Sequence, residues 1–340
     1  MTGVTASGSP SSAAGSEASG GDPLLRPLTI GGLGLDRRLF MAPMAGLTTP
    51  ALRRSVRRWG AGLVFTEMIS AYGVHYDNRR TLGYFAHGED EHPLGFQLFG
   101  ADADVLADAA GRAVAAGADL VDLNMACPVR KVVKTGAGAA LLAEPDRAAA
   151  IVAAVARAVE GAAPGRGVPV TVKIRAGLRE GDELGRRTAP RLVAAGAAAV
   201  CIHPRTAAQL YRGHADHAMT FALAAELPVP VVASGDVDGR EAALALLDGG
   251  AAAVMLARHA IGAPWLFGQV LGAAEPAAGE KAAEVRRFAA EALADLGARA
   301  VGHLRQFWPK FRRHGALDKP LSLELMRARK ESEIRALLGL

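Results

Sequence analysis

A short apolar pattern recurs four times along the chain, each time beginning near a glycine followed by alanine. The copies are WGAGLVFT from Trp59, AGADLVDL from Ala116, AGAAAVCI from Ala195 and GGAAAVML from Gly249. A glycine at this point can adopt the left-handed conformation that ends a helix, and the Val, Leu and Ile residues that follow suit a strand buried on both faces. Each copy therefore predicts the end of a helix and the start of a buried strand.

Further apolar segments lie between these copies, and several of them begin at a proline. They are RLFMAP from Arg38, PLGFQLF from Pro93, VPVTVKI from Val168 and PVVAS from Pro230. Together the two sets predict eight strands, near 39–43, 63–66, 94–99, 120–124, 170–174, 199–203, 230–234 and 252–256. Stretches rich in Ala, Leu, Asp and Arg predict helices between them, for example over 101–116, 146–159, 186–195 and 239–248.

Eight alternating strand–helix units are typical of a (β/α)8 TIM barrel of the α/β class, which we expect over 23–275. An open doubly wound sheet is the alternative, but no G-x-G-x-x-G segment follows the first predicted strand. Residues 280–340 show apolar residues at helical spacing and no strand pattern. They predict a small all-α helical bundle, with breaks at Pro309 and Pro320.

The first 22 residues are rich in Ser, Gly and Ala, with no basic start and no apolar stretch, and predict a disordered tail rather than a signal peptide. No apolar run elsewhere reaches the length of a membrane span. The chain has only two cysteines among 340 residues, and no Cys/His cluster has the spacing of zinc ligands. We therefore expect a cytoplasmic protein, monomeric, without metal, disulfide framework or membrane contact.

The net charge of +5 is unevenly distributed. Residues 281–340 hold 13 Lys and Arg against 7 Asp and Glu, a net of +6, whereas the preceding 280 residues hold 26 against 27, a net of −1. All of the excess lies in the predicted helical bundle, as expected of a basic region that meets a polyanion. A solvated helical surface is the alternative, and the charge pattern alone does not choose between them.

Polar residues follow almost every predicted strand of the barrel. Since active sites of such barrels lie at the carboxyl ends of the strands, these residues predict a functional mouth. The residues at these strand ends are Pro43, Met44 and Ala45 at the first strand, Glu67 at the second, Gln97 in the third, Asn124 and Cys127 after the fourth, Lys173 and Arg175 at the end of the fifth, His203 and Arg205 at the end of the sixth, Ser234, Gly235 and Asp236 at the seventh, and Arg258 after the eighth.

Two of these positions favour an anionic ligand. Lys173 lies between apolar strand residues in VTVKIRAG, where an ammonium group is costly without a negative partner. A reduced flavin ring would be such a partner, and an ion pair with Glu67 or Asp122 is the structural alternative. Ser234-Gly235-Asp236 and the turn around Arg258 offer backbone N–H groups and a guanidinium where barrels commonly bind phosphate.

The two cysteines differ in their surroundings. Cys201 lies inside an apolar strand and predicts a packed thiol. Cys127 precedes a proline in a loop that continues with Arg130, Lys131 and Lys134, and these cations would lower its pKa; an inert buried cysteine is the alternative. His203 begins the segment H-P-R-T at a strand end, which favours the site over the core.

Taken together, these segments resemble the tRNA-dihydrouridine synthases, in particular the bacterial B-type branch. The similar runs, in the family's order, are APMAGLTTPALRR (42–54), TEM (66–68), GFQLFG (95–100), VDLNMACPVRKVVKTGAGAALL (121–142), VTVKIRAG (170–177), IHPRTAAQLYRGHADH (202–217), SGDVDG (234–239) and AVMLARHAIGAPWLF (253–267). The N-M-x-C-P loop and the H-x-R-T-x-x-Q-x-Y-x-G-x-A-D run are specific as a pair.

The resemblance implies an enzyme that binds FMN at the barrel mouth, is reduced by NADPH and reduces a uridine of tRNA. Hydride would reach C6 of the uracil, and Cys127 would be the general acid that protonates C5, for which its thiol must stay protonated. It implies that Pro43, Met44, Ala45, Gln97, Lys173, His203, Ser234, Gly235, Asp236, Ala257 and Arg258 bind the cofactor. It also implies that Asn124, Arg175, Arg205, Lys131 and Lys134 bind substrate, and that 280–340 is the tRNA-binding domain.

Three positions depart from the family pattern. Ala126 stands where family members usually have glycine, Ser234 replaces an asparagine, and Ala257 replaces a glycine before Arg258.

Two other functions are alternatives to the tRNA-dihydrouridine synthase. One is an FMN-dependent barrel that reduces a free small molecule, such as a pyrimidine, and the other is a non-catalytic RNA-binding protein. The basic C-terminal region disfavours the reductase of a free small molecule, because a small substrate needs no docking surface for a polyanion.

Overall fold

The computed structural model describes residues 21–340, so the expected disordered tail lies outside the described residues except for its last two positions. Asp22 already belongs to the folded protein. Its carboxylate accepts from the Leu24 N–H at the start of the short helix η1 (Pro23–Leu25) and pairs with Arg240 at 2.9 Å. The folded structure therefore includes residues that precede the barrel.

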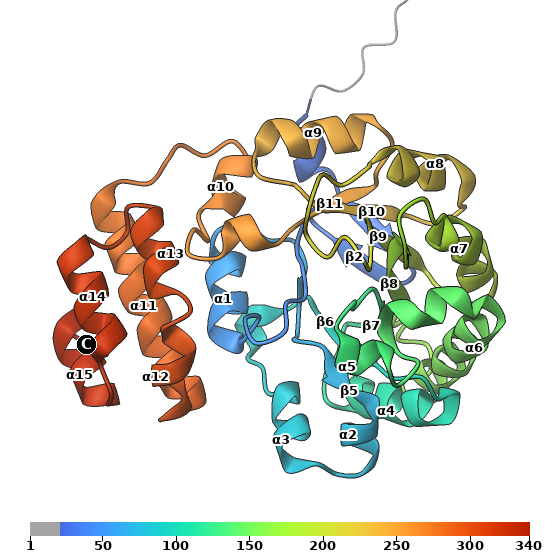
Figure 1. Ribbon diagram of the computed structural model, residues 1–340, viewed down its shortest axis with the longest axis horizontal. Helices are drawn as coiled ribbons and strands as arrows, with labels where there is room; N and C mark the ends of the chain where they lie inside the picture. Colours follow the sequence, from blue (N-terminus) through green and yellow to red (C-terminus); the bar gives the residue numbers. More distant parts are fainter. Residues whose placement is uncertain (1–20) are drawn as a thin grey trace, which may run out of the picture.

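Eight parallel strands form the barrel, and they are the eight that the sequence predicts. They are β3 (Leu39–Met41), β4 (Val64–Phe65), β6 (Leu94–Phe99), β7 (Leu120–Met125), β8 (Val170–Gly177), β9 (Ala199–Thr206), β10 (Val231–Ser234) and β11 (Ala253–Leu256). The order around the sheet is β3-β11-β10-β9-β8-β7-β6-β4. A bridge between Phe40 and Leu63 joins β3 to β4 and closes the ring (Figure 1). The (β/α)8 barrel is thus confirmed.

The recurring glycine has the backbone conformation that the sequence pattern predicts. In each of the four copies one glycine has a positive φ, between 99° and 113°, directly after a helix; these are Gly60, Gly117, Gly196 and Gly250. A side chain would be strained there, so glycine allows the chain to leave the helix and enter the next strand at once.

Three short strands were not predicted. β1 (Leu28–Ile30) and β2 (Leu33–Leu35) form an antiparallel hairpin before the barrel, and β5 (Ile69–Ser70) pairs with the end of β6. The hairpin turns at Gly31 and Gly32, a two-glycine step that is a recognised turn signal. Each strand has two or three residues, too few for a clear alternating pattern.

Helices surround the barrel in the expected alternation (Figure 1). The longer ones are α1 (Pro50–Arg58), α4 (Ala103–Ala115), α6 (Pro145–Ala162), α7 (Leu184–Ala194), α8 (Ala218–Glu226) and α9 (Arg240–Asp248). The shorter ones are α2 (Ala71–His75), α3 (Arg79–Leu82), η2 (Gly83–Phe85), η3 (Glu89–Glu91), α5 (Arg130–Val133), η4 (Gly138–Ala143), η5 (Arg258–Ala260) and α10 (Leu266–Val270). Their Ala-rich inner faces pack close to the sheet, which suits a chain with few aromatic residues.

The C-terminal region is entirely helical. It contains α11 (Ala278–Leu296), α12 (Arg299–Leu304), α13 (Trp308–Arg313), α14 (Lys319–Arg327) and α15 (Glu331–Leu338). Pro309 and Pro320 lie in the first turns of α13 and α14 and so begin helices, because the first turn has no use for the N–H that proline lacks. Phe288, Phe307 and Phe311 pack as its core, with ring centroids 4.8–6.3 Å apart.

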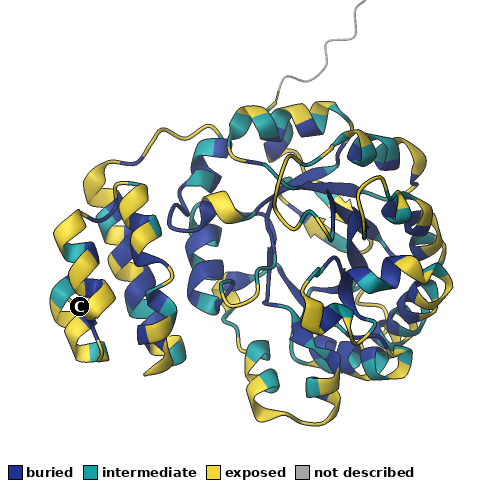
Figure 2. Cartoon of the chain, viewed as in Figure 1, coloured by how far each residue is buried: buried dark blue, intermediate teal, exposed yellow. Residues whose placement is uncertain are grey.

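Acidic residues of α11 face the barrel. Arg58 of α1 binds Glu284 at 2.7 Å and Glu291 at 2.8 Å, and Arg54 binds Asp295 at 2.7 Å. Figure 2 shows this facing side of the two helices largely buried. No helix within residues 21–340 is long and apolar enough to cross a membrane.

Candidate active site at the mouth of the barrel

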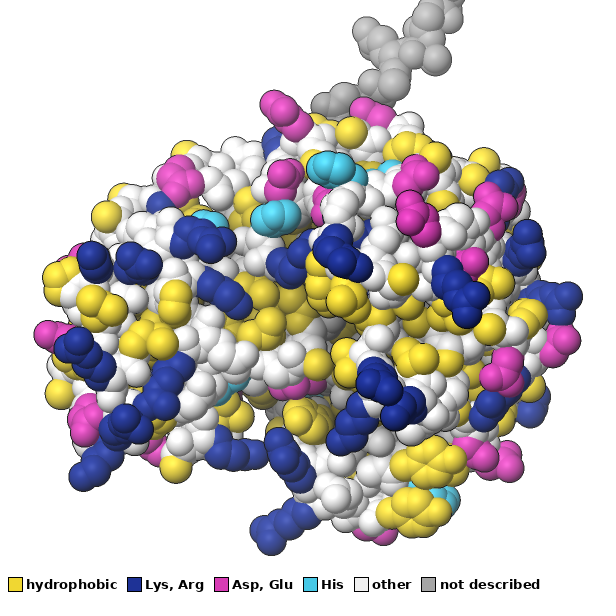
Figure 3. All heavy atoms as spheres, viewed as in Figure 1, with side chains coloured by type: hydrophobic (Ala, Val, Ile, Leu, Met, Phe, Trp, Pro, Cys, Tyr) yellow, Lys and Arg dark blue, Asp and Glu magenta, His cyan; other side chains and the backbone are white. Residues whose placement is uncertain are grey.

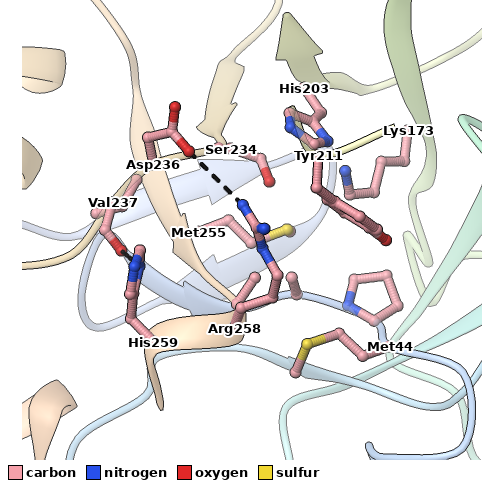
Figure 4. Close-up of a pocket in the computed structure, with 14 residues that line it drawn as sticks. Met44, Lys173, His203, Tyr211, Ser234, Asp236, Val237, Met255, Arg258 and His259 are labelled. Carbon is pink, nitrogen blue, oxygen red and sulfur yellow. Dashed lines mark hydrogen bonds and ion pairs between the residues drawn. The ribbon is translucent and has the colours of Figure 1, made fainter. Parts of the chain in front are cut away.

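A cavity of about 560 Å³ lies at the carboxyl ends of strands β3 and β8–β11 (Figure 4). Nine of the predicted site residues line it: Pro43, Met44, Lys173, His203, Ser234, Gly235, Asp236, Ala257 and Arg258. Separate parts of the chain come together here because parallel strands end on the same rim. The other candidates, Ala45, Gln97, Asn124, Cys127, Arg175, Arg205, Lys131 and Lys134, do not line this cavity.

One end of the cavity is built to hold an anion. The backbone N–H groups of Gly235, Asp236 and Arg258 have no acceptor within residues 21–340. Gly235 has φ +110°, and a Cβ there would come within 2.7 Å of the His203 ring. Free N–H groups beside the half-exposed Arg258 guanidinium form a cradle for a phosphate.

Asp236 orients this cradle and does not serve as a free acid. Burial raises the pKa of its carboxyl, but the Ala215 N–H and the Arg205 guanidinium outweigh burial and lower that pKa below its ordinary value. Arg205 binds both carboxylate oxygens, at 2.7 and 2.9 Å. Asp236 has φ +54°, a strained conformation that these contacts hold in place.

The opposite end of the cavity contains Lys173. Its side chain is 8% exposed, points into the cavity and has no hydrogen bond or ion pair within the described chain (Figure 4). The alternative ion pairs with Glu67 and Asp122 are not formed. A buried ammonium without a partner is costly, so the site favours an anionic ligand at this end as well.

His203 lines the cavity with an uncharged imidazole ring. Burial, and then the nearby cations Lys173, Arg175 and Arg205, lower its pKa to about 2. The Arg205 guanidinium donates to Nε2 at 3.2 Å, so the imidazole carries its proton on Nδ1. This ring can pack against a ligand and can donate one hydrogen bond, but it does not act as a proton source near neutral pH.

A chain of hydrogen bonds connects the barrel interior to the loop of Cys127. The Gln97 amide donates to Asp122 at 2.6 Å, and the Asn124 amide donates to Gln97 at 2.8 Å. The Asn124 oxygen then accepts from the backbone N–H of Cys127 at 2.8 Å. Asp122 also accepts from Thr171, and its burial raises its pKa to about 6. Gln97 and Asn124 thereby position the loop.

Cys127 is half-buried, and its burial raises the pKa of its thiol despite the Val129 N–H and Arg175, which oppose the shift. The expectation that neighbouring cations lower this pKa is therefore wrong. Lys131 and Lys134 are exposed, and neither perturbs the thiol. The thiol stays protonated at neutral pH, as a general acid requires.

The two arginines predicted to bind substrate are engaged within the protein. Arg175 is 2% exposed and donates to the carbonyls of Ala126, Thr206 and Leu210 at 2.8–3.0 Å. Arg205, equally buried, holds Asp236. Both arginines therefore position loops of the mouth, and the prediction of direct substrate contacts stays a prediction.

Tyr211 is the main residue that sequence reasoning did not single out. It lies in the loop after β9 and lines the cavity, with the Arg258 guanidinium 4.5 Å from its ring centroid and the His203 ring 6.2 Å away (Figure 4). The signal was present, because this tyrosine belongs to the Q-x-Y-x-G run. His259, which contacts the Val237 carbonyl at 3.3 Å, also lines the cavity.

The fold and the site define a class, a (β/α)8-barrel enzyme with a cradle of free backbone N–H groups at its mouth and a protonated thiol in a neighbouring loop. Residues 40–314 match the family model for dihydrouridine synthase (Dus), so the chain belongs to that family. Within residues 21–340 no cluster of His, Cys, Asp or Glu has the arrangement of a metal site.

Curated relatives are similar over most of the chain. A probable tRNA-dihydrouridine synthase 1 of Synechocystis sp. is 41% identical over 248 residues, which cover 72% of this chain and 67% of the relative. The tRNA-dihydrouridine synthase B of Pseudomonas aeruginosa is 36% identical over 271 residues, covering 78% and 80%.

Solved structures show the fold. Morphinone reductase in complex with tetrahydroNAD matches with a TM-score of 0.52 at 16% identity, over 75% of this chain and 92% of that one. Histamine dehydrogenase from Rhizobium sp. 4-9 matches with a TM-score of 0.55 at 16% identity, and there the match covers 72% of this chain and 47% of the other.

Proposed function

We propose that this protein is a flavin-dependent tRNA-dihydrouridine synthase, which reduces the C5–C6 double bond of uridines in tRNA. The observation that carries the proposal is the cavity at the mouth, with an anion cradle at one end and the unpartnered ammonium of Lys173 at the other. Membership of the dihydrouridine synthase family and the names of the relatives support this substrate.

The residues present fit FMN. Ser234, Gly235, Asp236, Ala257 and Arg258 would hold its ribityl phosphate, and Lys173 would face the ring edge where negative charge gathers on reduction. Pro43, Met44 and Ala45 would line the ring, with Gln97 and His203 beside it. When bound, the flavin supplies the hydride that uracil C6 accepts, and NADPH supplies the electrons that reduce the flavin.

Cys127 completes the reaction. As C6 gains hydride, negative charge develops on the C5 side of the uracil, and the Cys127 Sγ–H donates its proton to C5. The resulting thiolate then takes a proton from water. The raised pKa of Cys127 suits this role, because nearly all of the thiol is protonated at neutral pH.

The substrate is a large polyanion, and cations surround the mouth to receive it. Lys131 and Lys134 lie exposed in the segment that follows Cys127 in the sequence, and the C-terminal helices carry a net charge of +6. The target uridine must leave its stack to enter the cavity, so the phosphates would be held outside while the base is flipped inside. Asn124, Arg175 and Arg205 would keep the loops around that base in position.

A reconstituted reaction tests the proposal. The purified protein should bind FMN and, with NADPH and an unmodified tRNA transcript, form dihydrouridine that mass spectrometry detects. Free uridine in place of tRNA should give no product, because the phosphate contacts are lost. A protein that binds no flavin, or that reduces free uridine as fast as tRNA, would contradict the proposal.

A further inference from the structure

A second cavity lies between the barrel and the C-terminal helices, outside the site described above. It measures about 1320 Å³ with its open mouth included. One loop separates it from the first cavity. Pro43 and Met44 line the first cavity, whereas Gly46 and Thr49 of the same loop, together with Pro50 at the start of α1, line the second.

Two unpaired cations stand at the borders of this second cavity. Arg80 of α3 and Arg299 of α12 line it, and both are exposed without a hydrogen bond or ion pair within residues 21–340. The other lining arginines, Arg53 and Arg54, are neutralised by Glu91 and Asp295. Figure 3 shows Lys and Arg side chains over the C-terminal helices and beside the gap between those helices and the barrel.

Inside the cavity the groups suit a base. Tyr84 and His303 present rings, and burial lowers the His303 pKa to about 4, so this imidazole is neutral at physiological pH. Glu67 is buried; one of its oxygens accepts from the Gly46 N–H, and the other has no partner within the described chain. Aromatic rings stack on nucleobases, and a free carboxylate oxygen accepts from a base N–H.

We infer that this cavity is a second nucleotide site, which takes a single-stranded nucleotide of the same tRNA whose target uridine enters the first cavity. Arg80 and Arg299 hold its phosphates from the two domains, and Tyr84, His303 and Glu67 hold its base. The inference rests on the proposed function. It means that the enzyme recognises two unstacked nucleotides of one RNA, one on each side of the loop 43–50.

Charge removal at the borders is the first test. Arg80→Ala and Arg299→Ala should each weaken binding of an unmodified tRNA transcript roughly tenfold. Each should also lower the slope of log affinity against log salt by about 0.7–0.9. Arg79→Ala on α3 and Arg157→Ala on α6 are the matched controls, because both residues are exposed, neither lines the cavity and neither belongs to the basic C-terminal helices. Equal losses in the variants and their controls would overturn the inference.

Filling the cavity without changing charge is the second test. Gly83 lines the cavity with a helical backbone, and a Cβ placed there meets nothing within 4 Å. Gly83→Trp should therefore fold normally, occupy the space and weaken tRNA binding at least tenfold with an unchanged salt slope. Gly34→Trp, on the exposed strand β2, is the control and should bind as the wild type does.

Wild-type affinity in Gly83→Trp would overturn the inference, even if the arginine variants bind weakly, because the cavity would then be empty in the complex. This outcome differs from a failure of the proposed function. If the proposed function is wrong, the wild-type protein itself will neither bind the transcript nor form dihydrouridine.

Discussion

The two cysteines show how the surroundings of one side chain determine its chemistry. Cys201 lies in the middle of β9 with its thiol 3.7 Å from the Met255 sulfur, and burial raises its pKa to about 11. Cys127 is only half-buried, packs beside Val132 and Ala137, and opens toward the rim. Both thiols stay protonated at neutral pH, but Cys201 is buried, whereas Cys127 is partly exposed.

Removal of the Cys127 thiol should abolish turnover without loss of binding. We expect Cys127→Ala to retain FMN and tRNA affinity and to form dihydrouridine about 10²–10⁴-fold more slowly, the usual contribution of a general acid. Cys201→Ala is the control and should retain turnover. The measurement is dihydrouridine formed per minute by mass spectrometry, and full activity of Cys127→Ala would exclude it as the acid.

The pKa of Cys127 makes a prediction about pH. The protonated thiol is the active form, and burial raises its pKa, so activity should be lost as pH rises only above the ordinary cysteine value of about 8.5. The rate at which tRNA oxidises the reduced enzyme, followed from pH 6 to 10, checks this. A decline centred below pH 8 would show that the loop lowers the pKa in solution.

At the scale of secondary structure, two elements hold residues of the site in place. They are the loop 43–49 after β3 and the strand β7. Glu67, directly after β4, accepts a short hydrogen bond from the Gly46 N–H and so ties the loop after β3 to its neighbouring strand. In β7, Asp122 holds Gln97 and Thr171 and supports the chain that ends at the Cys127 N–H. Neither Glu67 nor Asp122 lines the first cavity.

Loss of the Glu67 support should loosen the loop that lines the cavity. We expect Glu67→Ala to weaken FMN binding about tenfold, since a backbone N–H loses its buried acceptor at a cost of roughly 1–3 kcal/mol. Glu67→Gln keeps an acceptor of the same shape and should stay within about twofold of the wild type. Fluorescence titration of apoprotein with FMN measures both, and equal affinities of the two variants would contradict the role.

The buried Asp122 carboxyl makes a prediction about stability. Its pKa rises from 3.8 to about 6 on folding, so its contribution is fully present below pH 3.8 and is lost as pH rises through 6. From pH 4 to pH 8, Asp122→Asn should therefore gain about 2–3 kcal/mol in unfolding free energy relative to the wild type.

Urea unfolding at the two pH values measures this change. Asp248→Asn, on the exposed end of α9, is the control and should differ from the wild type by less than about 0.5 kcal/mol at both pH values. A pH-independent difference for Asp122→Asn would mean that the carboxyl is not protonated in the folded protein.

At the scale of the whole molecule, the C-terminal helices place acidic residues against the barrel and basic residues on their outer surface. The acids Glu284, Glu291 and Asp295 of α11 are used against Arg54 and Arg58 of the barrel. Most of the basic residues of the C-terminal helices remain exposed. The domain interface thus neutralises its own charges and leaves a basic outer surface, which we propose as the surface that meets the RNA.

Affinity for tRNA should therefore depend steeply on salt. The double variant Arg312→Gln/Arg313→Gln, at the exposed end of α13, should lower the slope of log affinity against log salt by about 1.4–1.8. The double variant Arg157→Gln/Arg166→Gln, on exposed positions around α6, removes the same charge and should leave the slope unchanged. Filter binding between 50 and 200 mM salt measures both, and equal slopes of the two variants would place the RNA elsewhere.

The barrel could be predicted because its signals are local. A glycine such as Gly117 ends a helix through its own backbone, and the strand that follows is buried on both faces whatever its neighbours are. Strand-end residues such as Lys173 and Arg258 could likewise be assigned to one rim, because parallel strands all end on the same side. Pro309 and Pro320 lie at breaks in the C-terminal helical run, as the sequence predicts, and the structure adds that each proline begins the helix after its break.

By itself, then, the sequence determined the eight strands, the side of the barrel that holds the mouth and the set of polar residues there. Only the tertiary structure decided what those residues do. Burial keeps the Cys127 proton in place, although its neighbours in sequence are cations. Packing leaves Lys173 without a hydrogen bond or ion pair within residues 21–340 and commits Arg175 and Arg205 to the protein's own carbonyls and carboxylate. These outcomes depend on desolvation and on contacts between distant segments, which no spacing along the chain records.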